Sequence, residues 1–510
     1  MSTPRAAWAG AGIIAGLAGL AVSHAAAMVL TLRSSPIVSV AETIIEVVPG
    51  TLIAGAIDNL GTNDKPILVI GIFTVMMILS VTAGQLARRN WWAPVLVFAA
   101  MGLMALGAVL TRHDATARDV VPVAAGVVTW VVVLSFLTDA LLLEDRSQQS
   151  SETPSDWHTR RGFVHKSVII GVLTVGIGYL GSFVGGKRRE VEKARQLLRL
   201  PVTLPSRPDN VSVQVPGMPT WQTPNDEFYQ IHTAVIVPAI QPDSWSIRIH
   251  GMVEREMVLS YQDLIEAQLT ERWITLNCVS NQVGGNLIGN AWWSGVLLAD
   301  LLERAGCHPD ADAVLQTSHD GWTCGTPLDA LTDPARHAML AVAMNGDPLP
   351  IDHGFPVRTI VPGLYGYVSA CKWVIDLEVT RFDEIEAYWT GKGWSERGPV
   401  KIASRIDVPH NGKDVEAGSV VIGGHAWSQH TGIDGVQISL DGGDWQDVRL
   451  GGVPNKDTWV QWRAEVDVAE GDHDVRVRAI GADGTVQTGA RADVVPDGAT
   501  GWHEIGFNAK

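Results

Sequence analysis

The stretch that decides the fold is residues 272–295, which reads RWITLNCVSNQVGGNLIGNAWWSG. Residues 273–276 form a β-type run, and the Ser, Asn and Gly residues after Cys278 indicate a loop rather than a regular element. A cysteine where a strand passes into a loop can act as a soft metal ligand or a nucleophile. The alternative is an inert buried thiol, which is the commoner state of a single cysteine. Other parts of the chain must distinguish these two roles.

The composition divides the chain into an apolar part, suited to a lipid bilayer, and a polar part, suited to water. The chain has 510 residues and a net charge of -16, and apolar runs fill roughly the first 185 residues. We therefore expect a membrane region followed by a large soluble part. The acidic balance predicts no nucleic-acid partner, because binding phosphates requires a basic face. The 4 cysteines include no CxxC pair, so we expect reduced thiols rather than a disulfide framework or a zinc site.

Residues 1–186 are predicted to form a transmembrane region of about five helices, since about 20 apolar residues can cross a bilayer. The predicted spans are residues 8–32, 66–86, 92–111, 119–143 and 163–186. Residues 36–59 are less apolar and contain Glu42 and Glu46, which favours an interfacial or re-entrant segment. Only His24 lies clearly inside a span, so a haem held by paired histidines is not expected there.

Residues 159–166, TRRGFVHK, precede the fifth predicted span and resemble a twin-arginine export signal. The alternative is a plain basic flank that only fixes topology. Export of a folded domain suits a protein that must load a cofactor before crossing the membrane. Together with positive-inside ordering, the motif predicts a multi-pass protein of the cytoplasmic membrane whose soluble part lies on the extracytoplasmic face.

The soluble half has three predicted parts. Residues 187–224 indicate a linker, helical and charged at first and then punctuated by Pro. Residues 225–400 mix short strands with short helices, which is typical of an α+β domain. Residues 401–510 alternate strands with Gly and Asp turns, which predicts a β-sandwich. The runs behind these predictions are strands at 245–249, 273–276, 372–379, 419–423, 435–440, 459–466 and 474–480, and a helix at 297–304.

Two further segments have the chemistry of an anion site. Residues 344–358 read MNGDPLPIDHGFPVR and residues 361–373 read VPGLYGYVSACKW. They place His353, Arg358 and Lys372 among Gly and Pro residues that fix loops and expose backbone N-H groups. Arg supplies a bidentate fork, Lys a point charge and Gly-rich backbone a cradle. The pattern favours a phosphate site over three unrelated surface charges.

These motifs, in this order, resemble the sulfite oxidase family of molybdopterin enzymes. The resemblance rests on NGDPLP, DHGFPVR, VPG and KW downstream of a Cys-x-x-Asn pair, Cys278 and Asn281. GHAWS at residues 424–428 and VQISLDGGDWQ at residues 436–446 resemble that family's immunoglobulin-like dimerisation domain. The resemblance covers residues 225–510 and implies a multi-domain fold. That fold has an α-helical transmembrane region, an α+β molybdopterin domain and an immunoglobulin-like β-sandwich through which a homodimer could form.

The resemblance also implies roles for individual residues. Cys278 would be the thiolate ligand of molybdenum, beside the two dithiolene sulfurs of the pterin, and a soft ligand suits that role. The family's active-site tyrosine segment appears here as GKGW at residues 391–394, and Tyr388 is the nearest catalytic substitute. Gln282 and Val283 stand where sulfite oxidases carry anion-binding arginines, which makes sulfite less favoured than the reaction class. The residues expected to bind the cofactor are His232, Asn281, Asp320, His353, Arg358 and Lys372.

The sequence therefore predicts a membrane-anchored, extracytoplasmic oxidoreductase that transfers an oxo group at molybdenum to or from a small molecule. Because no haem module is recognisable, electrons would pass through a separate carrier, a c-type cytochrome or a quinone-linked membrane protein. One alternative keeps the cofactor and reverses the direction, as a sulfoxide or oxyanion reductase. Another is a metal-free receptor, which the presence of Cys278 disfavours. A transporter with an accessory domain would need charged or broken spans.

Overall fold

The computed structural model describes residues 5–30, 32, 35–49, 64–112, 115–149, 167–172, 174 and 187–510. The chain forms two compact units, Met1–Val191 with Thr233–Pro238 and Glu192–His232 with Ala239–Lys510. The twin-arginine segment and most of the fifth predicted span lie outside the described residues.

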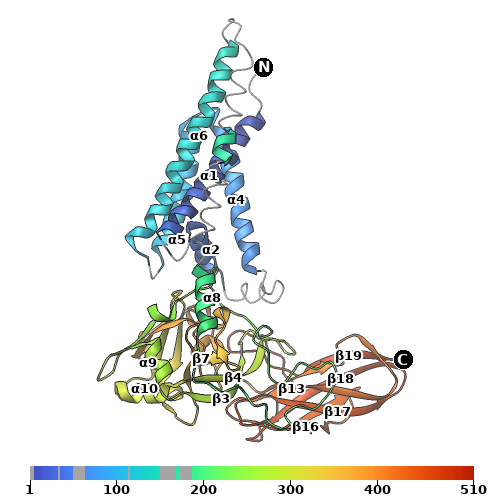
Figure 1. Cartoon of the computed structure of the whole chain (residues 1–510). Helices are drawn as coiled ribbons and strands as arrows, with labels where there is room; N and C mark the ends of the chain where they lie inside the picture. Colours follow the sequence, from blue (N-terminus) through green and yellow to red (C-terminus); the bar gives the residue numbers. More distant parts are fainter. Residues whose placement is uncertain are drawn as a thin grey trace. The chain divides into compact units, whose positions relative to one another are not determined.

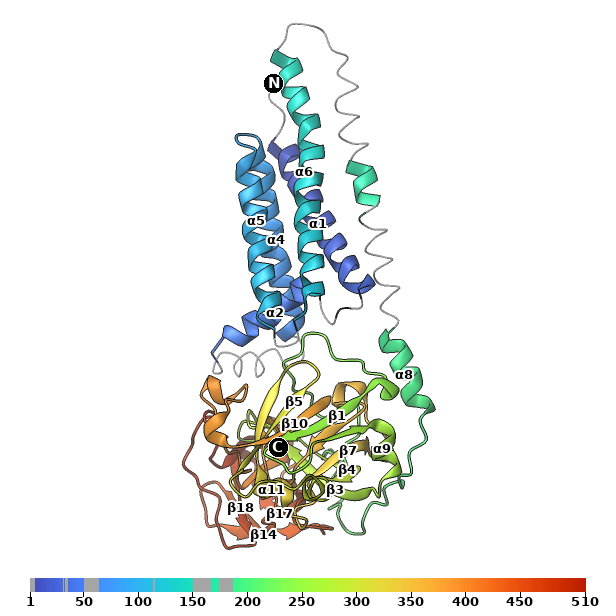
Figure 2. The same cartoon turned by 90° about the vertical axis from the view of Figure 1, so that its left-hand side faces the viewer.

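The first unit contains long apolar helices, and Figure 1 and Figure 2 show α1, α4, α5 and α6 side by side. The helix bounds are α1 (Arg5–Val29), α2 (Pro36–Val47), α4 (Asp64–Ala87), α5 (Trp92–Leu110) and α6 (Val120–Gln149). Among the described helices, 4 are long and apolar enough to cross a membrane. They coincide with the first, second, third and fourth predicted spans and are compatible with membrane anchoring.

Small residues bring α1 close to its neighbours. A side chain at Gly12 would collide with the carbonyl group of Ser80 in α4. The indole N-H of Trp130 in α6 donates to the carbonyl oxygen of Gly16, at 3.1 Å. Such close approach through small residues is a usual way for apolar helices to pack where lipid replaces water.

Residues 187–510 are described without a gap, and two sheets carry their first part. One sheet has the order β2 (Met257–Ser260), β1 (Ser246–Gly251), β10 (Val374–Thr380), β5 (Ala313–Ser318), β6 (Thr323–Pro327). The other has the order β3 (Thr270–Asn277), β4 (Ile288–Leu297), β7 (Met339–Met344), β8 (Asp347–Pro348), with β9 (Arg358–Ile360) also paired to β7. The helices of this region are α8 (Lys187–Leu197), α9 (Tyr261–Glu266), α10 (Leu298–Ala305) and α11 (Leu328–Thr332).

The local patterns explain these elements. In α10, Leu298, Leu301 and Leu302 are spaced to share one buried face. The helix then ends at Gly306, whose φ of 71° is the left-handed conformation that glycine adopts without strain. The predicted helix at 297–304 and strands at 245–249, 273–276 and 372–379 correspond to α10, β1, β3 and β10.

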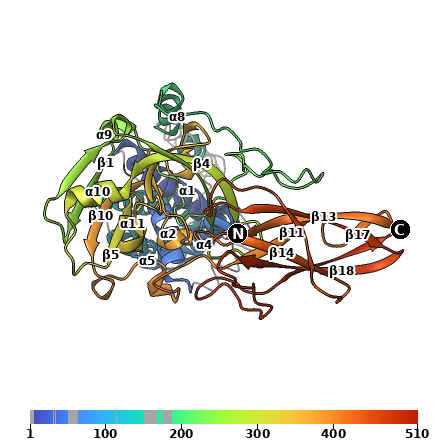
Figure 3. The same cartoon turned by 90° about the horizontal axis from the view of Figure 1, so that it is seen from below.

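The C-terminal region consists of two facing sheets, whose strands Figure 3 shows running alongside one another. Their orders are β11 (Ala403–Val408), β13 (Gly418–Trp427), β17 (Val460–Val468), β16 (Arg449–Leu450), and β12 (Lys413–Val415), β19 (His503–Ala509), β18 (Gly471–Gly481), β14 (Ile433–Leu440), β15 (Gln446–Asp447). Alternate residues such as Val475, Val477 and Ala479 point into one shared core. Period-2 burial of this kind is what the sequence pattern predicts; the immunoglobulin-like assignment stays a prediction.

Within the predicted linker at 187–224, the Pro-punctuated residues 201–224 contain no helix or strand, yet they are firmly packed. The Trp221 indole donates to the carbonyl oxygen of Trp459 at 3.2 Å, and the Trp459 indole donates to that of Trp221 at 2.8 Å. Both rings belong to a buried cluster with Trp273 and Trp427. The segment therefore fastens the C-terminal sheets to β3, the strand that leads to Cys278.

Candidate functional site

The loop between β3 and β4 presents Cys278. The Cys278 N-H donates to the carbonyl oxygen of Leu287 at 3.0 Å, which continues the β3–β4 ladder into the loop. Asn281 closes the turn, because its N-H donates to the Cys278 carbonyl oxygen at 3.1 Å and its Oδ1 accepts the Leu287 N-H at 2.8 Å. Cys278 is 8% exposed. Most of the Cys278 surface therefore lies inside the fold.

A cradle of basic residues forms where β9 begins. Nη1 of Arg358 donates to the carbonyl oxygen of His353 at 3.2 Å, and Nζ of Lys372 donates to that of Asp352 at 3.0 Å. Arg358 and Lys372 pair in an isolated antiparallel β-bridge. Gly354, between the two segments, has a φ of 109°, and a Cβ there would lie 3.0 Å from Arg358 Cβ. Only glycine fits this turn without strain.

Burial controls the charges of the cradle. Burial, together with Lys372 and Arg358, lowers the pKa of His353 to about 3, so this imidazole is neutral at pH 7. Its Nε2 donates to the carbonyl oxygen of Asn225 at 3.0 Å, which leaves Nδ1 as the acceptor nitrogen. Burial lowers the pKa of Arg358 to about 10, so Arg358 keeps its positive charge. The cradle thus combines two cations with one neutral acceptor.

Tyr229 connects the cradle to Cys278. The Tyr229 side chain is half-buried, and burial of its phenol and the neighbouring Cys278 thiol raise its pKa while Arg358 opposes them. The Tyr229 ring stacks on Phe228 at 5.2 Å between centroids, and Phe228 meets the His353 ring edge-to-face at 5.7 Å. The structure thus brings Cys278, Arg358 and His353 together around one aromatic pair.

A second phenol approaches Cys278 from the C-terminal side. Burial raises the pKa of Tyr365 to about 12, and Asp497 and Cys278 also contribute to the rise. The Tyr365 oxygen accepts the Lys401 N-H at 3.3 Å. Nζ of Lys401 pairs with Oδ1 of Asp497 at 2.7 Å. Both phenols are therefore neutral hydrogen-bond donors at pH 7.

The other residues predicted to bind the cofactor, His232, Asp320 and Asn281, lie in three different parts of the domain. The His232 ring meets Trp373, the residue after Lys372, at 5.8 Å between centroids, so His232 joins the cradle. Asp320 shapes the turn between β5 and β6, where its Oδ1 accepts the Trp322 N-H at 3.3 Å. The Asn281 carboxamide oxygen is engaged within the loop. That Asn281, Asp320 and His232 touch a cofactor stays a prediction.

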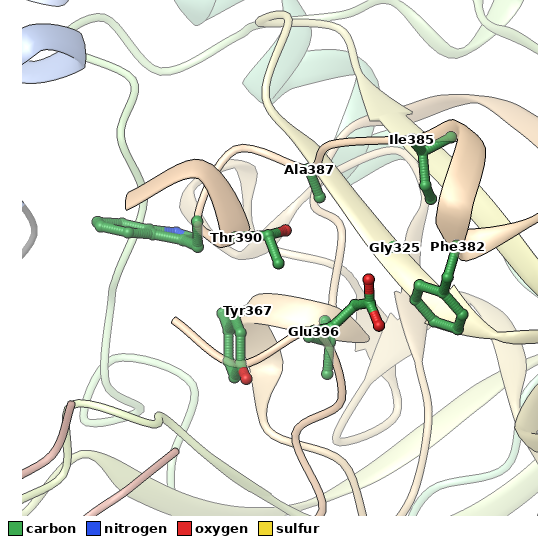
Figure 4. Close-up of a pocket in the computed structure, with 9 residues that line it drawn as sticks. Gly325, Tyr367, Phe382, Ile385, Ala387, Thr390 and Glu396 are labelled. Carbon is green, nitrogen blue, oxygen red and sulfur yellow. The ribbon is translucent and has the colours of Figure 1, made fainter. Parts of the chain in front are cut away.

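The two residues that flank Tyr388, Ala387 and Trp389, line a small hollow, shown in Figure 4, whose lining includes none of the cradle residues. The Tyr388 N-H donates to Oγ1 of Thr323 at 3.2 Å, and Nζ of Lys392 lies 4.9 Å from the centre of the Tyr388 ring. The hollow has a cavity volume of about 10 Å³, roughly the room that one water requires. It is lined by Gly325, Tyr367, Val368, Phe382, Ile385, Ala387, Trp389, Thr390 and Glu396. The catalytic role of Tyr388 stays a prediction.

Sequence reasoning missed Tyr229 and Tyr365. Tyr229 lies in FYQIHT at residues 228–233, of which only His232 was predicted to bind the cofactor. Tyr365 lies within VPGLYGYVSACKW, of which only Lys372 was predicted to bind the cofactor. For Tyr365 the available signal was a tyrosine in a Gly-containing loop that also carries Lys372, whereas residues 228–233 contain no glycine and offered no comparable signal.

Known proteins resemble this part of the chain. The family model described as "Oxidoreductase molybdopterin binding domain" matches residues 233–389. Mitochondrial sulfite oxidase of Homo sapiens is 30% identical over 301 residues, which is 50% of this chain and 55% of that protein. The chain thus spans about half the length of the animal sulfite oxidases it matches.

Two further similar proteins differ in how much of their length matches this chain. The uncharacterized oxidoreductase YuiH of Bacillus subtilis is 32% identical over 181 residues, which is 36% of this chain and 87% of that protein. Among solved structures, the sulfane dehydrogenase SoxCD from Paracoccus pantotrophus has a TM-score of 0.48 and 24% identity. That match covers 53% of this chain and 75% of that one.

Proposed function

Because this chain belongs to the sulfite oxidase family of molybdopterin-dependent oxidoreductases, we propose that it transfers an oxo group between a small molecule and molybdenum held by Cys278. The observation that carries the proposal is the convergence of Cys278, Tyr229 and the cradle of His353, Arg358 and Lys372. A soft sulfur ligand and an anion-binding cradle are the two features that a molybdenum pterin phosphate requires.

The buried polar atoms of the site fit this cofactor. Within the described residues, Nδ1 of His353 and Nε of Arg358 are buried and lack hydrogen-bond partners. An unsatisfied buried polar group costs about 1–3 kcal/mol, so such atoms mark a place where a bound group completes the bonding. Nδ1 of His353 can accept a hydrogen bond from a pterin N-H. Nε of Arg358 can donate to a phosphate oxygen. His353, Arg358 and Lys372 would hold the pterin and phosphate, and Cys278 would hold the metal.

When bound, the cofactor supplies a molybdenum centre that exchanges two electrons as an oxo group moves to or from the substrate. The protein binds the cofactor, orients it and shields it from water. Arg358 neutralises phosphate charge. His353 beside it stays neutral and offers its Nδ1 as a hydrogen-bond acceptor. Tyr229 and Tyr365 keep their phenolic protons at pH 7 and can each donate a hydrogen bond beside Cys278. Burial of Cys278 excludes bulk water from its sulfur.

A reductase of an uncharged oxo donor, such as a sulfoxide, is the second candidate. It is favoured by the pairing of charged and polar side chains near Tyr365 and in the Cys278 loop. Lys401 is paired with Asp497 at 2.7 Å, and the Gln282 amide faces Oδ1 of Asp493 at 3.4 Å. No surplus cation is evident among these described side chains for a sulfite dianion. A neutral substrate would instead use the phenols as donors.

The proposal extends to the whole chain. Residues 1–186 would anchor the protein in the cytoplasmic membrane, and the linker at 187–224 would join them to the catalytic domain at 225–400 on the extracytoplasmic face. Residues 401–510 would form an immunoglobulin-like domain that supports a homodimer. Electrons would pass to or from a separate carrier, a c-type cytochrome or a quinone-linked protein.

A two-way substrate screen tests the function. Full-length protein purified in detergent from molybdate-supplied cells would be assayed with sulfite and an oxidised artificial acceptor, and with sulfoxides or oxyanions and a reduced artificial donor. We expect turnover in one direction that Cys278→Ser abolishes. The matched control is Cys307→Ser, because this half-exposed thiol lies after α10. Equal turnover in wild type and Cys278→Ser would contradict the assignment.

A further inference from the structure

The Cys278 loop has a second support outside the molybdopterin domain. Gly284 and Gly285 form its tip, where Gly285 N-H donates to the Gln282 carbonyl oxygen at 2.9 Å. Their carbonyl and Cα groups turn toward residues of the C-terminal sheets. The loop is thus held at its base by β3 and β4 and at its tip by a different part of the chain.

Arg405 of β11 makes the polar contact at the tip. Its Nη1 donates to the carbonyl oxygen of Gly285 at 2.9 Å. Arg405 is 6% exposed, and a hydrogen bond from a buried cation is roughly twice as strong as a neutral one. The guanidinium also lies against the Trp459 ring, with 5.7 Å from Cζ to the ring centre.

A buried ionic chain fixes this guanidinium. Nε of Arg405 lies 2.8 Å from Oδ1 of Asp407, and Nδ1 of His425 lies 2.6 Å from Oδ2 of the same carboxylate. Burial raises the pKa of Asp407, but His425 and Arg405 outweigh this effect and lower it overall. A β-sheet core does not need such a chain for stability, because apolar replacements of buried ion pairs are often neutral or stabilising. The chain holds the guanidinium where its Nη1 reaches the Gly285 carbonyl oxygen.

His503 makes the steric contact at the tip. Its Nδ1 accepts the Ile406 N-H at 2.9 Å, which fixes the ring. A Cβ at Gly284, whose φ is 78°, would collide with that ring. Adjacent residues of β11 therefore control both glycines, Arg405 directly and Ile406 through His503.

We propose that Arg405 is a positioning residue for Cys278: by holding the Gly285 carbonyl group, it keeps the loop closed and the sulfur directed at the site. Arg405 touches neither the sulfur nor the cradle and acts through the loop. The description of Cys278 as a metal ligand rests on the proposed function, whereas the control of the loop by Arg405 does not.

The test compares Arg405→Lys with wild type. A lysine can keep the charge that Asp407 needs, but it lacks the fork that reaches Asp407 and Gly285 together. Arg476→Lys is the matched control, because Arg476 pairs with Glu504 at 3.1 Å on the surface of β18. Arg405→Met, which keeps the aliphatic contact with Trp459, is the second variant if Arg405→Lys folds poorly.

The readout is alkylation of Cys278 in full-length, cofactor-free protein, mapped by peptide mass spectrometry. Loss of one charged hydrogen bond predicts roughly tenfold faster alkylation in Arg405→Lys, with no change in Arg476→Lys. In loaded protein, the Mo(V) paramagnetic resonance signal should also shift in Arg405→Lys alone. Wild-type alkylation in a folded Arg405→Lys protein would overturn the proposal. If wild type proves to contain no molybdenum, the alkylation comparison still decides the role of Arg405.

Discussion

Protonation states at the site are set by single side chains and their burial. His353 stays neutral because burial disfavours its charged form, and because Lys372 and Arg358 would repel a third positive charge. Tyr229 keeps its proton because burial and the Cys278 thiol disfavour a phenolate. The site therefore offers donors, acceptors and cations of fixed kind across the neutral pH range.

This fixed state of His353 has a consequence for stability in the cofactor-free protein. Its folded pKa of about 3 lies below the ordinary 6.5, so the unfolded chain binds one more proton between these values. Stability falls as pH drops through this window, by about 1.4 kcal/mol per pH unit for one such group. His353→Asn should make the fall shallower by about that slope. Urea unfolding at several pH values between 7 and 5 measures how the free energy of unfolding depends on pH in each protein. The same slope in wild type and in His353→Asn would contradict the burial argument.

Sequence reasoning located the charged and sulfur-bearing residues but not the aromatic ones between them. His353, Arg358 and Lys372 stand in short Gly- and Pro-rich motifs, whose chemistry can be read locally. Tyr229 acquires its role only through folding, because it is 49 positions before Cys278 and 129 before Arg358 in the numbering. Local pattern cannot reveal which of several tyrosines meets a buried thiol.

At the scale of elements, loops carry the site and strands hold the loops. The β3–β4 loop carries Cys278, and the segments on either side of β9 carry the cradle. The two segments approach closely at Gly354, since a Cβ there would lie 3.0–3.2 Å from atoms of Arg358 and Lys372.

Gly354→Ala should therefore damage both stability and cofactor binding. Alanine at a φ of 109° adds backbone strain of about 1–3 kcal/mol, and its Cβ displaces Arg358. Gly412→Ala is the matched control: Gly412 also has a positive φ, 74°, but no described atom lies within 4 Å of its Cβ. Both variants should lose thermal stability, and only Gly354→Ala should lose bound molybdopterin. Equal cofactor content in the two variants would contradict the cradle assignment.

The strands could be predicted because the alternation of apolar and polar residues is a local pattern. Which strands pair with each other could not be predicted from it. β1 pairs in parallel with β10, with Arg248 opposite Asp376, and no local pattern encodes so distant a partner. The packed state of residues 201–224 was also hidden, because Pro-rich extended sequence looks the same in a loose linker and in a strap fixed by Trp221.

At the scale of the whole molecule, the chain combines long apolar helices with an acidic soluble part. The helices are compatible with membrane anchoring, as hydropathy predicts. Sidedness and export depend on residues 159–166, which lie outside the described part of the chain, so they remain predictions from sequence.

The export prediction can be tested with a conservative change. Replacing Arg160 and Arg161 by Lys keeps the charge but should leave the catalytic domain in the cytoplasm, because a twin-arginine signal requires arginine. The same replacement at Arg188 and Arg189, in α8, is the matched control and should not affect export. Protease treatment of intact spheroplasts distinguishes the two locations. Cleavage of the domain in the Arg160/Arg161 variant would refute the signal.

The central claim is that Cys278 binds molybdenum, and X-ray absorption at the molybdenum edge tests it most directly. Wild type and Cys278→Ser would be compared at equal molybdopterin content. We expect about one sulfur ligand fewer at molybdenum in Cys278→Ser, because serine offers a hard oxygen in place of a soft thiolate. The same number of sulfur ligands in both proteins, or wild-type protein without molybdenum from molybdate-supplied cells, would contradict the claim.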